Sequence, residues 1–568
     1  MQLGIDFGTS YTKMAACMEG RLAYEAPAFT EPIPSILAYL PATDQLYFGA
    51  EALQLLEEQD AVVVPFFKLA LKRNPGLLLG SYDLERILTA FFTYLYQRVA
   101  AFAASPIDSV TLSVPNYFGL KARRSLYTAL QTVFAGAFIY LLPEPVSALL
   151  GYQALHPEAA LQGEILIIDI GGGTTDFSFL TMGGFDEKLV LETQLQMGHD
   201  TFSGAEVDKG VIRTILAPLF QMQTGRALPL ELLEEKNLSP SNRHLLLALL
   251  RLAEAAKIEI SVHHHAAVSL AEIFPELTLT LPVDQSLFTT ALNPLWQRLD
   301  SYLQTVLQPQ ARSLGLFDHR GWKLDHILLL GGASLTLGLC SRLEDFFKGV
   351  PIHLKNIDKP YQAVGDCCWD ADRGESIYTI YPFHFYIEKQ ADQPDSRHQL
   401  ELIPFDTANL ELNLTQSYRI FSVLPLSPYN LASEPDHLEI KIYELSSESV
   451  DKTLERFSGQ EVILHYRGSN YNSDEAVHID LDLSSSQLIV NYSAAPANCY
   501  QIDLFADWST RQMAQAEWLS AYKYVDGELI NSLQAQLKSN QAYGLTPYSN
   551  QVMTTYYKLI CLLQILNP

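Results

Sequence analysis

Two similar turn sequences, one near the start and one well along the chain, constrain this protein more than any other feature. The first spans Gly4–Ser10 and the second Ile168–Asp176. Each runs from an apolar strand through an aspartate into glycines and hydroxyl side chains. Glycine lacks a Cβ and reaches positive φ, so such turns let backbone N–H groups close around phosphate oxygens. The repeat predicts two turns that face each other and clamp a polyphosphate.

The aspartates of these turns, Asp6, Asp169 and Asp176, cannot bind phosphate themselves. A carboxylate beside a phosphate implies a bridging Mg²⁺ that keeps several waters and neutralises the charge. We therefore predict a magnesium nucleotide as the ligand, with Asp6 and Asp169 facing the metal through water. The sequence has no GxxxxGK[ST] run, which excludes a P-loop NTPase on motif grounds.

A third glycine turn, Gly331-Gly332-Ala333, follows the apolar run His326–Leu330. Bare backbone there suits a flat base or a ribose. Turns after strands often contain glycine for structural reasons alone, so this turn is a weak signal by itself.

The charge of the chain limits its partners. A formal net charge of -26 repels phosphate backbones and anionic lipid surfaces, which disfavours general binding of nucleic acid or membranes. The six scattered cysteines, without a CxxC pair, are typical of free thiols in a reducing compartment. The start of the chain leaves no room for a secretory signal, so we expect the cytoplasm.

Short apolar runs alternate with helical patterns from Met1 to about Ala371, which predicts an α/β layer architecture. Ser81–Asp83 supply capping residues before an apolar stripe from Leu84 to Val99, which predicts a helix. Three β-branched or leucine-rich runs are expected as buried strands: Val110–Val114, Ile165–Ile168 and His326–Leu330.

The period of the pattern changes after a polar stretch at 371–376. Apolar and polar residues then alternate at Leu438–Ile442 and Val477–Leu483, which predicts half-solvated antiparallel sheet. After Asp507 the pattern becomes helical again, with Met513, Ala516 and Trp518, and predicts a small helical tail.

Further motifs follow the two turns in one order. They are Val114–Phe118, which resembles VPxYF, with Arg123 after it; Leu142–Tyr152, which resembles NEPxAAAxxYG; Gly198–Asp208, which resembles GDxxLGGxDFD; and Ala253–Ser261, which resembles AEKAKIELS. From Met1 to about Val364 the chain therefore resembles the DnaK class of 70-kDa heat-shock chaperones, and its HscC branch most.

The resemblance implies a fold and a domain order. We expect an actin-like two-lobed ATPase domain, then a β-sandwich domain and a short helical segment. The expected ranges are 1–374 for the ATPase domain, 375–382 for the linker, 383–506 for the substrate-binding domain and 507–568 for the tail or lid.

The resemblance also assigns roles to residues. Lys68, Glu144, Asp169 and Thr174 would be catalytic: Glu144 and Asp169 orient the metal and the attacking water, and Lys68 touches the γ-phosphate or that water. One lysine among carboxylates supplies the positioning and charge neutralisation that phosphoryl transfer needs. The implied nucleotide-binding residues are Asp6, Gly8, Thr9, Ser10, Tyr11, Gly171, Gly172, Gly173, Thr174, Asp176, Gly204, Glu254, Lys257, Ser261, Gly331, Gly332 and Ala333.

Glu254, Lys257 and Ser261 fall at i, i+3 and i+7, hence on one helix face, as an adenosine-contacting edge requires. Without the resemblance, the same spacing is that of a charged solvent face. The triplet His263–His265 is interpreted as a surface segment, because adjacent histidines on a strand cannot all point one way.

Four positions depart from the family pattern. Leu335 stands where the family has an adenine-stacking arginine, and Pro143 where it has asparagine. Tyr361 and Thr379 replace aspartates at the interdomain surface and in the linker. Coupling between the domains is therefore a weaker expectation than nucleotide binding.

The last third resembles the family faintly. Leu402–Pro404 resembles the LIP before the substrate sheet, and Asp480–Tyr492 resembles its FDIDxxGILxVSA hairpin. These matches imply a module for extended peptides. The resemblance implies ATP or ADP with Mg²⁺, and allows K⁺; it implies client polypeptides as partners, and allows a J-domain co-chaperone and a nucleotide-exchange factor.

Two other kinds of function use the same nucleotide core. A small-molecule kinase would not need the alternating region after Ala371. An actin-like filament or division protein is disfavoured by the extra β domain and by the lack of a membrane-binding amphipathic tail. A chaperone relative that is specialised as a regulator or dedicated to one client stays open, because the linker is divergent.

Overall fold

The structure is a computed structural model of the 568-residue chain. It describes residues 1–55, 60–74, 76–100, 102, 106–115, 118–159, 161–185, 188–199, 202–233, 240–354 and 359–369, and the strands between 376 and 513. The chain divides into two compact units. The first unit is Met1–Asn116 with Ser125–Glu375, and the second is Tyr117–Arg124 with Ser376–Pro568.

The first unit contains a sheet built around the N-terminal strand. Its strand order is β11 (Phe138–Pro143), β10 (Ser109–Val114), β1 (Gln2–Phe7), β2 (Tyr11–Met18) and β3 (Arg21–Leu22), with β4 (Ile33–Pro34) also on β2. Strand β1 is parallel to β10 and antiparallel to β2, where Asp6 lies opposite Lys13. The first glycine turn is therefore the connection between two antiparallel strands.

A second sheet in the same unit repeats this pairing. Its order is β20 (Ile352–His353), β19 (His326–Leu330), β12 (Gly163–Ile170), β13 (Thr175–Phe185) and β14 (Lys188–His199). Strand β12 is parallel to β19 and antiparallel to β13, where Asp169 lies opposite Asp176. The quasi-repeat of the sequence is thus a repeat of topology, and the three predicted buried strands are confirmed as parts of β10, β12 and β19.

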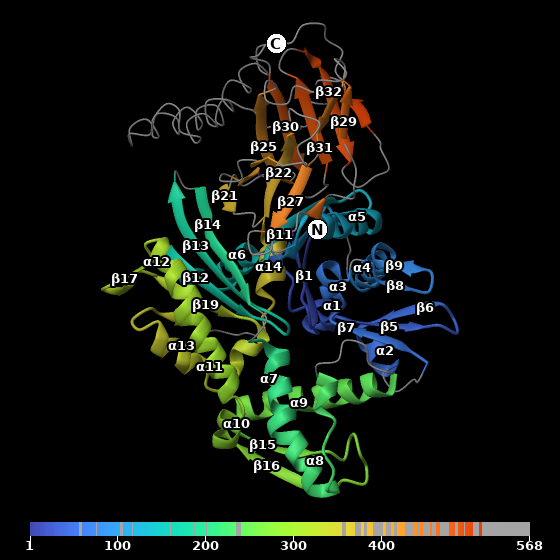
Figure 1. Ribbon diagram of the computed structural model, residues 1–568, viewed down its shortest axis with the longest axis vertical. Coiled ribbons are helices and arrows are strands. Elements are labelled where there is room, and N and C mark those ends of the chain that lie inside the picture. The colour runs from blue at the N-terminus through green and yellow to red at the C-terminus, as the bar shows by residue number, and fades with distance from the viewer. Residues whose placement is uncertain are drawn as a thin grey trace, which may run out of the picture. The chain divides into compact units, whose positions relative to one another are not determined.

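Two helices of the first unit, α6 (Glu144–Leu155) and α14 (Tyr361–Cys368), cross with their backbones in contact. A Cβ added to Gly151 would lie 1.8 Å from the carbonyl oxygen of Tyr361, and one added to Gly365 would lie 1.8 Å from that of Ser147. Only glycine fits at these positions. Figure 1 shows the first sheet (blue) and the second sheet (green to teal) on opposite sides of this crossing.

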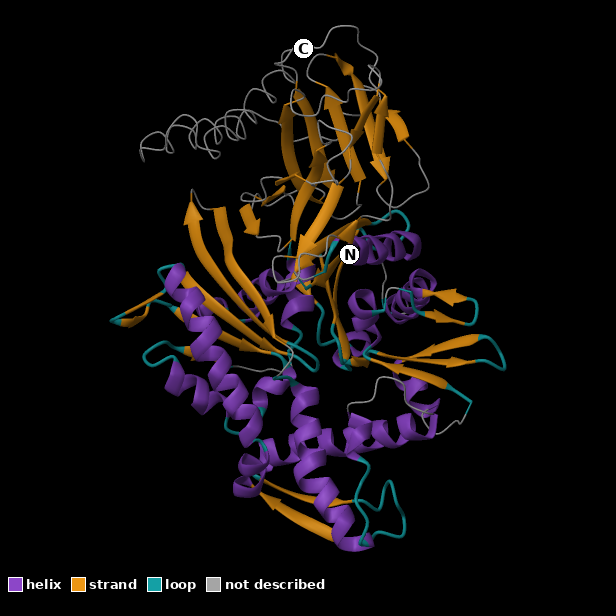
Figure 2. Cartoon of the chain, viewed as in Figure 1, coloured by secondary structure: helices purple, strands orange, loops and turns teal. Residues whose placement is uncertain are grey.

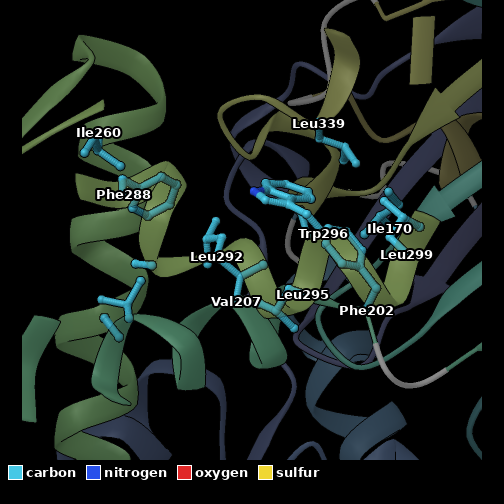
Figure 3. Packing of buried hydrophobic residues seen from close by; sticks show 14 of the residues in the cluster. Ile170, Phe202, Val207, Ile260, Phe288, Leu292, Leu295, Trp296, Leu299 and Leu339 are labelled. Atoms are coloured by element: carbon cyan, nitrogen blue, oxygen red, sulfur yellow. The ribbon is translucent and has the colours of Figure 1, made fainter. Parts of the chain in front are cut away.

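A large apolar core packs against the second sheet. It joins β12 to α7 (Gly204–Val211), α9 (Pro240–His263) and α11 (Asn293–Tyr302). The Phe202 and Trp296 rings lie 5.4 Å apart in this core, and Figure 3 shows Leu295, Leu299 and Ile170 near them. Burial of each large apolar side chain stabilises the folded state by about 1.5–3 kcal/mol. This core fixes the ends of β12 and α7, which carry glycine turns.

The predicted helix after Ser81–Asp83 is confirmed as α4 (Leu84–Ala100), with Asp83 Oδ1 accepting a hydrogen bond from the Arg86 N–H at 2.9 Å. Figure 2 shows the mixture of helices and strands in the first unit. Its other helices are α1 (Pro27–Thr30), α2 (Gly49–Gln54), α3 (Ala70–Arg73), α8 (Ala217–Thr224), α10 (Gln285–Ala291), α12 (Gln308–Ser313) and α13 (Leu339–Phe346); α5 is Leu120–Val133. The smaller sheets contain β5 (Ile36–Leu40), β6 (Gln45–Phe48), β7 (Val62–Pro65), β8 (Leu78–Leu79), β9 (Tyr82–Asp83), β15 (His265–Ser269), β16 (Thr280–Asp284), β17 (Phe317–Asp318) and β18 (Gly321–Trp322).

The described part of the second unit beyond residue 375 consists of strands, and the pairings within it are antiparallel, as the alternating pattern predicts. One run orders β21 (Ser376–Thr379), β24 (Leu410–Asn413), β25 (Ser417–Pro425), β30 (Ala476–Asp482), β31 (Gln487–Tyr492), β32 (Ala495–Asp503) and β33 (Thr510–Met513). Others pair β22 (Phe383–Lys389) with β23 (Glu401–Pro404) and β27 (Ile442–Ser446), β27 with β28 (Glu455–Arg456), and β26 (His437–Ile440) with β29 (Val462–His465).

One element of the second unit corrects the sequence analysis. Thr510–Met513, expected at the start of a helical tail, is a strand that pairs with β32. The pairing supplies backbone hydrogen bonds from distant residues, which override a local helical pattern. The rest of the expected tail, from residue 514, lies outside the described residues.

Two further expectations concern the described residues. The described cysteines Cys17, Cys340, Cys367 and Cys368 form no disulfide, in agreement with the sequence analysis. No helix that the structure describes combines the length and the apolar character needed to span a membrane.

Candidate nucleotide site

The first glycine turn is held by a serine from the next segment of the chain. The Ser35 hydroxyl donates to the Gly8 carbonyl oxygen at 2.7 Å, and the Ser35 N–H donates to that of Ser10 at 2.8 Å. A Cβ on Gly8 would lie 2.3 Å from the Tyr11 carbonyl oxygen, so the turn requires glycine. Sequence reasoning missed Ser35, because no motif marks it.

The second glycine turn is held by the start of α7. The Gly171 N–H donates to the Thr174 carbonyl oxygen at 2.9 Å, while the Gly204 and Ala205 N–H groups donate to those of Gly171 and Gly172 at 2.9 and 2.8 Å. Gly204 thereby joins the second turn. The sequence brings these segments together because Phe202 and Val207 bury themselves in the adjoining core.

The two turns face each other. A Cβ added to Gly172 would lie 1.8 Å from Ser10 Oγ, and one added to Gly173 would lie 3.0 Å from Thr9 Cγ2. Backbone from one sheet therefore meets hydroxyl side chains from the other. This is the arrangement that the quasi-repeat predicts, and it needs glycine on one side.

Three aspartates lie at the turns, Asp6 buried and Asp169 and Asp176 half-buried, and desolvation raises the pKa of each. The pKa of Asp6 is raised to about 6, with Lys13 opposing the shift. The pKa of Asp169 is raised to about 7 and that of Asp176 to about 8, with repulsion from Glu144 as the next cause in both. Buried carboxylates this close to one another are poised to accept a cation, because a cation relieves both desolvation and repulsion.

Lys68 reaches this group from the short helix Phe67–Leu69. It is 3% exposed, and its Nζ lies 2.7 Å from Glu144 Oε1 at the start of α6. The ammonium also lies 5.7 Å from the centroid of the Phe7 ring. The lysine and the glutamate that the resemblance singles out are therefore a buried ion pair rather than a solvated lysine beside a surface acid.

Two residues near Asp169 and Asp6 escaped the sequence analysis. Gln362, in α14, donates from Nε2 to Asp169 Oδ2 at 2.9 Å. Lys13, in β2, lies opposite Asp6, and its charge acts on both Asp6 and Asp169. A signal for Lys13 was present, since it is the one charged side chain in the strand Tyr11–Met18.

The three residues of the expected adenosine edge have different neighbours. Lys257 pairs with Asp208 at 2.7 Å, and Ser261 Oγ accepts a hydrogen bond from the Leu337 N–H at 3.3 Å. Burial raises the pKa of Asp208 to about 6 despite Lys257. Glu254, on the same helix, is half-buried and acts electrostatically on Tyr11.

The third turn itself closes against the second sheet. Gly331 has φ 79°, and a Cβ there would lie 2.2 Å from the Ile170 carbonyl oxygen, whereas Gly332 has open space. Ala333 is buried, 3.4 Å from the position of a Cβ on Gly204. The second and third glycine turns thus meet at Gly204, and the first turn meets the second at Gly172 and Gly173.

The structure shows where three residues that depart from the family pattern lie. Leu335 is 51% exposed beside the third turn. Pro143 precedes the first residue of α6. Tyr361 is buried, with its hydroxyl 3.0 Å from His156 Nε2. His263, His264 and His265 are all exposed where α9 ends and β15 begins, so the surface interpretation is confirmed.

The donor set suits a hydrated divalent cation. Among the described residues, no three His, Cys, Asp or Glu side chains are close enough to hold one ion directly. Asp6 and Asp169 nevertheless supply desolvated carboxylates, one at each of the two turns. Mg²⁺ usually keeps several waters and takes only one or two carboxylates, so the residues present fit it.

Two sheets of matching topology, each with an aspartate leading into a glycine turn, define a mixed α/β fold consistent with an actin-like ATPase domain. The family described as "Hsp70 protein" matches residues 72–361, which is 290 of the 568 residues. The chain belongs to this family.

Two curated relatives carry the description "Chaperone protein DnaK". That of Elusimicrobium minutum (strain Pei191) is 25% identical over 339 residues, covering 58% of this chain and 51% of the relative. That of Methanothermobacter thermautotrophicus is 26% identical over 363 residues, covering 62% of this chain and 56% of the relative. The chain thus spans just over half the length of these relatives.

Proposed function

We propose that this protein is an ATP-dependent molecular chaperone, whose actin-like ATPase domain binds and hydrolyses Mg-ATP to control the binding of client polypeptides. The observation that carries the proposal is the convergence of two glycine turns, buried carboxylates and the Lys68–Glu144 ion pair. Membership of the Hsp70 family and the likeness to DnaK chaperones support it.

In this proposal the backbone of Gly8–Ser10 and Gly171–Thr174 surrounds the phosphates, with Gly204 and Tyr11 beside them. Glu254, Lys257, Ser261 and Gly331–Ala333 contact the adenosine. Asp6 and Asp169 hold Mg²⁺ through water, with Asp176 nearby, and K⁺ is a further ion that the site allows. When bound, the metal supplies neutralisation of the phosphate charge.

Lys68, Glu144, Asp169 and Thr174 act on the reaction itself. Glu144 accepts from Lys68 through Oε1, which leaves Oε2 to orient the attacking water. Lys68 places a buried positive charge where the transferred phosphoryl group develops negative charge. Asp169 is fixed by Gln362, and Thr174 donates to Asp176 at 3.0 Å, so neither side chain must reorganise during the reaction.

We assign the client site to the β-rich second unit, with residues 383–506 as the substrate domain, 375–382 as linker and 507–568 as the tail. Extended peptides can be recognised by backbone pairing with exposed strands. A J-domain protein and a nucleotide-exchange factor are the proposed co-chaperones, and the cytoplasm the proposed location.

ATP turnover with and without client-like peptides tests this function. Purified protein should bind Mg-ATP by calorimetry, and extended apolar peptides should accelerate its hydrolysis. A panel of sugars and glycerol serves as the control. Acceleration by a sugar, with a phosphorylated product, would establish a kinase instead, and absence of Mg-dependent binding at millimolar ATP or ADP would end the proposal.

A further inference from the structure

Lys13 is placed on the phosphate side of the first sheet by strand register. It lies directly opposite Asp6 in the antiparallel pair β1–β2. Directly opposite residues project from the same face of a sheet, with Cβ atoms about 4.5–5.5 Å apart. The Lys13 side chain therefore shares its face of the sheet with the Asp6 carboxylate, and it is half-buried there.

The electrostatics agree with this placement. The positive charge of Lys13 lowers the pKa of Asp6 more than any other charge does, and it also lowers that of Asp169 in the second sheet. Since these aspartates belong to the two opposing turns, Lys13 acts on both sides of the site.

The two lysines of the site differ in what holds them. Lys68 is bound to Glu144 at 2.7 Å. Lys13, in contrast, forms no hydrogen bond or ion pair with any residue in the described part of the chain. Four carboxylates, Asp6, Glu144, Asp169 and Asp176, surround two lysines, so the formal balance is four negative against two positive charges.

We propose that Lys13 is a second cation of the phosphate site, whose ammonium contacts the polyphosphate of the bound nucleotide. The inference rests on the proposed nucleotide-binding function and adds to it a residue in the opposing strand of the first turn. A lysine ammonium is a compact point charge with three donors, a form that proteins use to bind phosphate. The carboxylates around it need Mg²⁺ as well, so Lys13 complements the metal.

Binding of adenosine, ADP and ATP to Lys13→Gln and Lys13→Arg, at saturating Mg²⁺, tests the proposal by calorimetry. Lys13→Gln should weaken ADP and ATP binding by roughly 10- to 100-fold, because a charge-assisted hydrogen bond is lost. Adenosine should bind within about 2-fold of wild type, because it has no phosphate. Lys13→Arg should keep most of the affinity.

Lys323→Gln is the matched control, because Lys323 is 53% exposed and pairs with Asp318 in the β17–β18 hairpin. It makes the same change of net charge and should bind all three ligands as wild type does. Melting without nucleotide shows whether each variant is folded.

Equal weakening of adenosine and ATP in Lys13→Gln would assign Lys13 a structural role and overturn the inference. Unchanged ADP and ATP binding would also overturn the inference, because Lys13 would then only offset the negative charge of the nearby carboxylates. A wild-type protein that binds neither ADP nor ATP would overturn the nucleotide function itself, before any variant is compared.

Discussion

Burial changes what the Lys68–Glu144 pair can do. Exposed ion pairs contribute little because water screens them, whereas this pair lies where Lys68 is 3% exposed. A buried ammonium that is already held in place pays no reorganisation when phosphate charge develops. We therefore expect the pair to stabilise the transition state of hydrolysis more than it stabilises bound ATP.

We predict that Lys68→Ala and Glu144→Gln slow single-turnover ATP hydrolysis on the order of 10²–10³-fold while changing ATP affinity only a few-fold. Rapid-mixing turnover and calorimetry on the same preparations measure both quantities. Lys323→Ala is the control and should match wild type. Parallel losses of rate and affinity would assign the pair to uniform binding.

Asp366 is a further buried acid, which lies in α14 beside Gly4 of β1. Its carboxylate accepts hydrogen bonds from the Ser113 N–H at 3.0 Å and the Ser147 hydroxyl at 2.5 Å, yet burial raises its pKa well above the usual range. The folded protein thus holds a proton there that the unfolded chain releases above about pH 4. Wild-type stability from this group is present at low pH and is lost as pH rises.

We predict that Asp366→Asn becomes more stable relative to wild type as pH rises from about 5, by at most about 1.4 kcal/mol per pH unit. The amide oxygen can accept from the Ser113 N–H and the amide nitrogen can donate to Ser147. Urea unfolding at several pH values measures the difference. A difference that stays constant with pH would show that Asp366 does not titrate between the folded and unfolded states.

At the scale of elements, the sequence predicts what local pattern determines. Strands β10, β12 and β19 and helix α4 follow from apolar period and a capping aspartate, because these signals lie within each segment. The facing of the two glycine turns follows from their repeat. The contact partners do not: Ser35 and Gln362 reach the site through packing that no local pattern encodes. Lys13 stands out as the one charged side chain of its strand, but only the strand register places it opposite Asp6. The Thr510–Met513 strand was mispredicted for the same reason.

The α6–α14 crossing also comes from packing between distant segments. We predict that Gly365→Ala destabilises the protein by about 1–3 kcal/mol or more, because the added Cβ would lie 1.8 Å from a fixed backbone oxygen. Thermal or urea unfolding measures this.

Gly183→Ala is the matched control for Gly365→Ala, since no atom lies within 4 Å of a Cβ at Gly183. Its effect should stay within about 0.5 kcal/mol. Equal effects of the two substitutions would mean that α6 and α14 separate at little energetic cost.

At the scale of the whole molecule, the proposed cycle requires that nucleotide state alters client binding. We predict that fluorescent apolar peptides bind the full chain about 10-fold more weakly with ATP than with ADP, within the usual range of coupling between sites. Glu144→Gln, which should hold ATP without turnover, keeps the ATP state during titration. Identical affinities would remove the cycle, and no peptide binding at all would indicate a dedicated client.

The repeated topology of the first unit bears on the orientation in which the site binds a phosphate chain. The positions opposite the leading aspartates are equivalent in the two sheets, and they hold Lys13 in one and Asp176 in the other. Two identical halves would accept a phosphate chain equally well in either orientation. With opposite charges at equivalent positions, a ligand whose ends differ meets different surroundings in its two orientations, so this pair of positions helps to set the direction in which it binds.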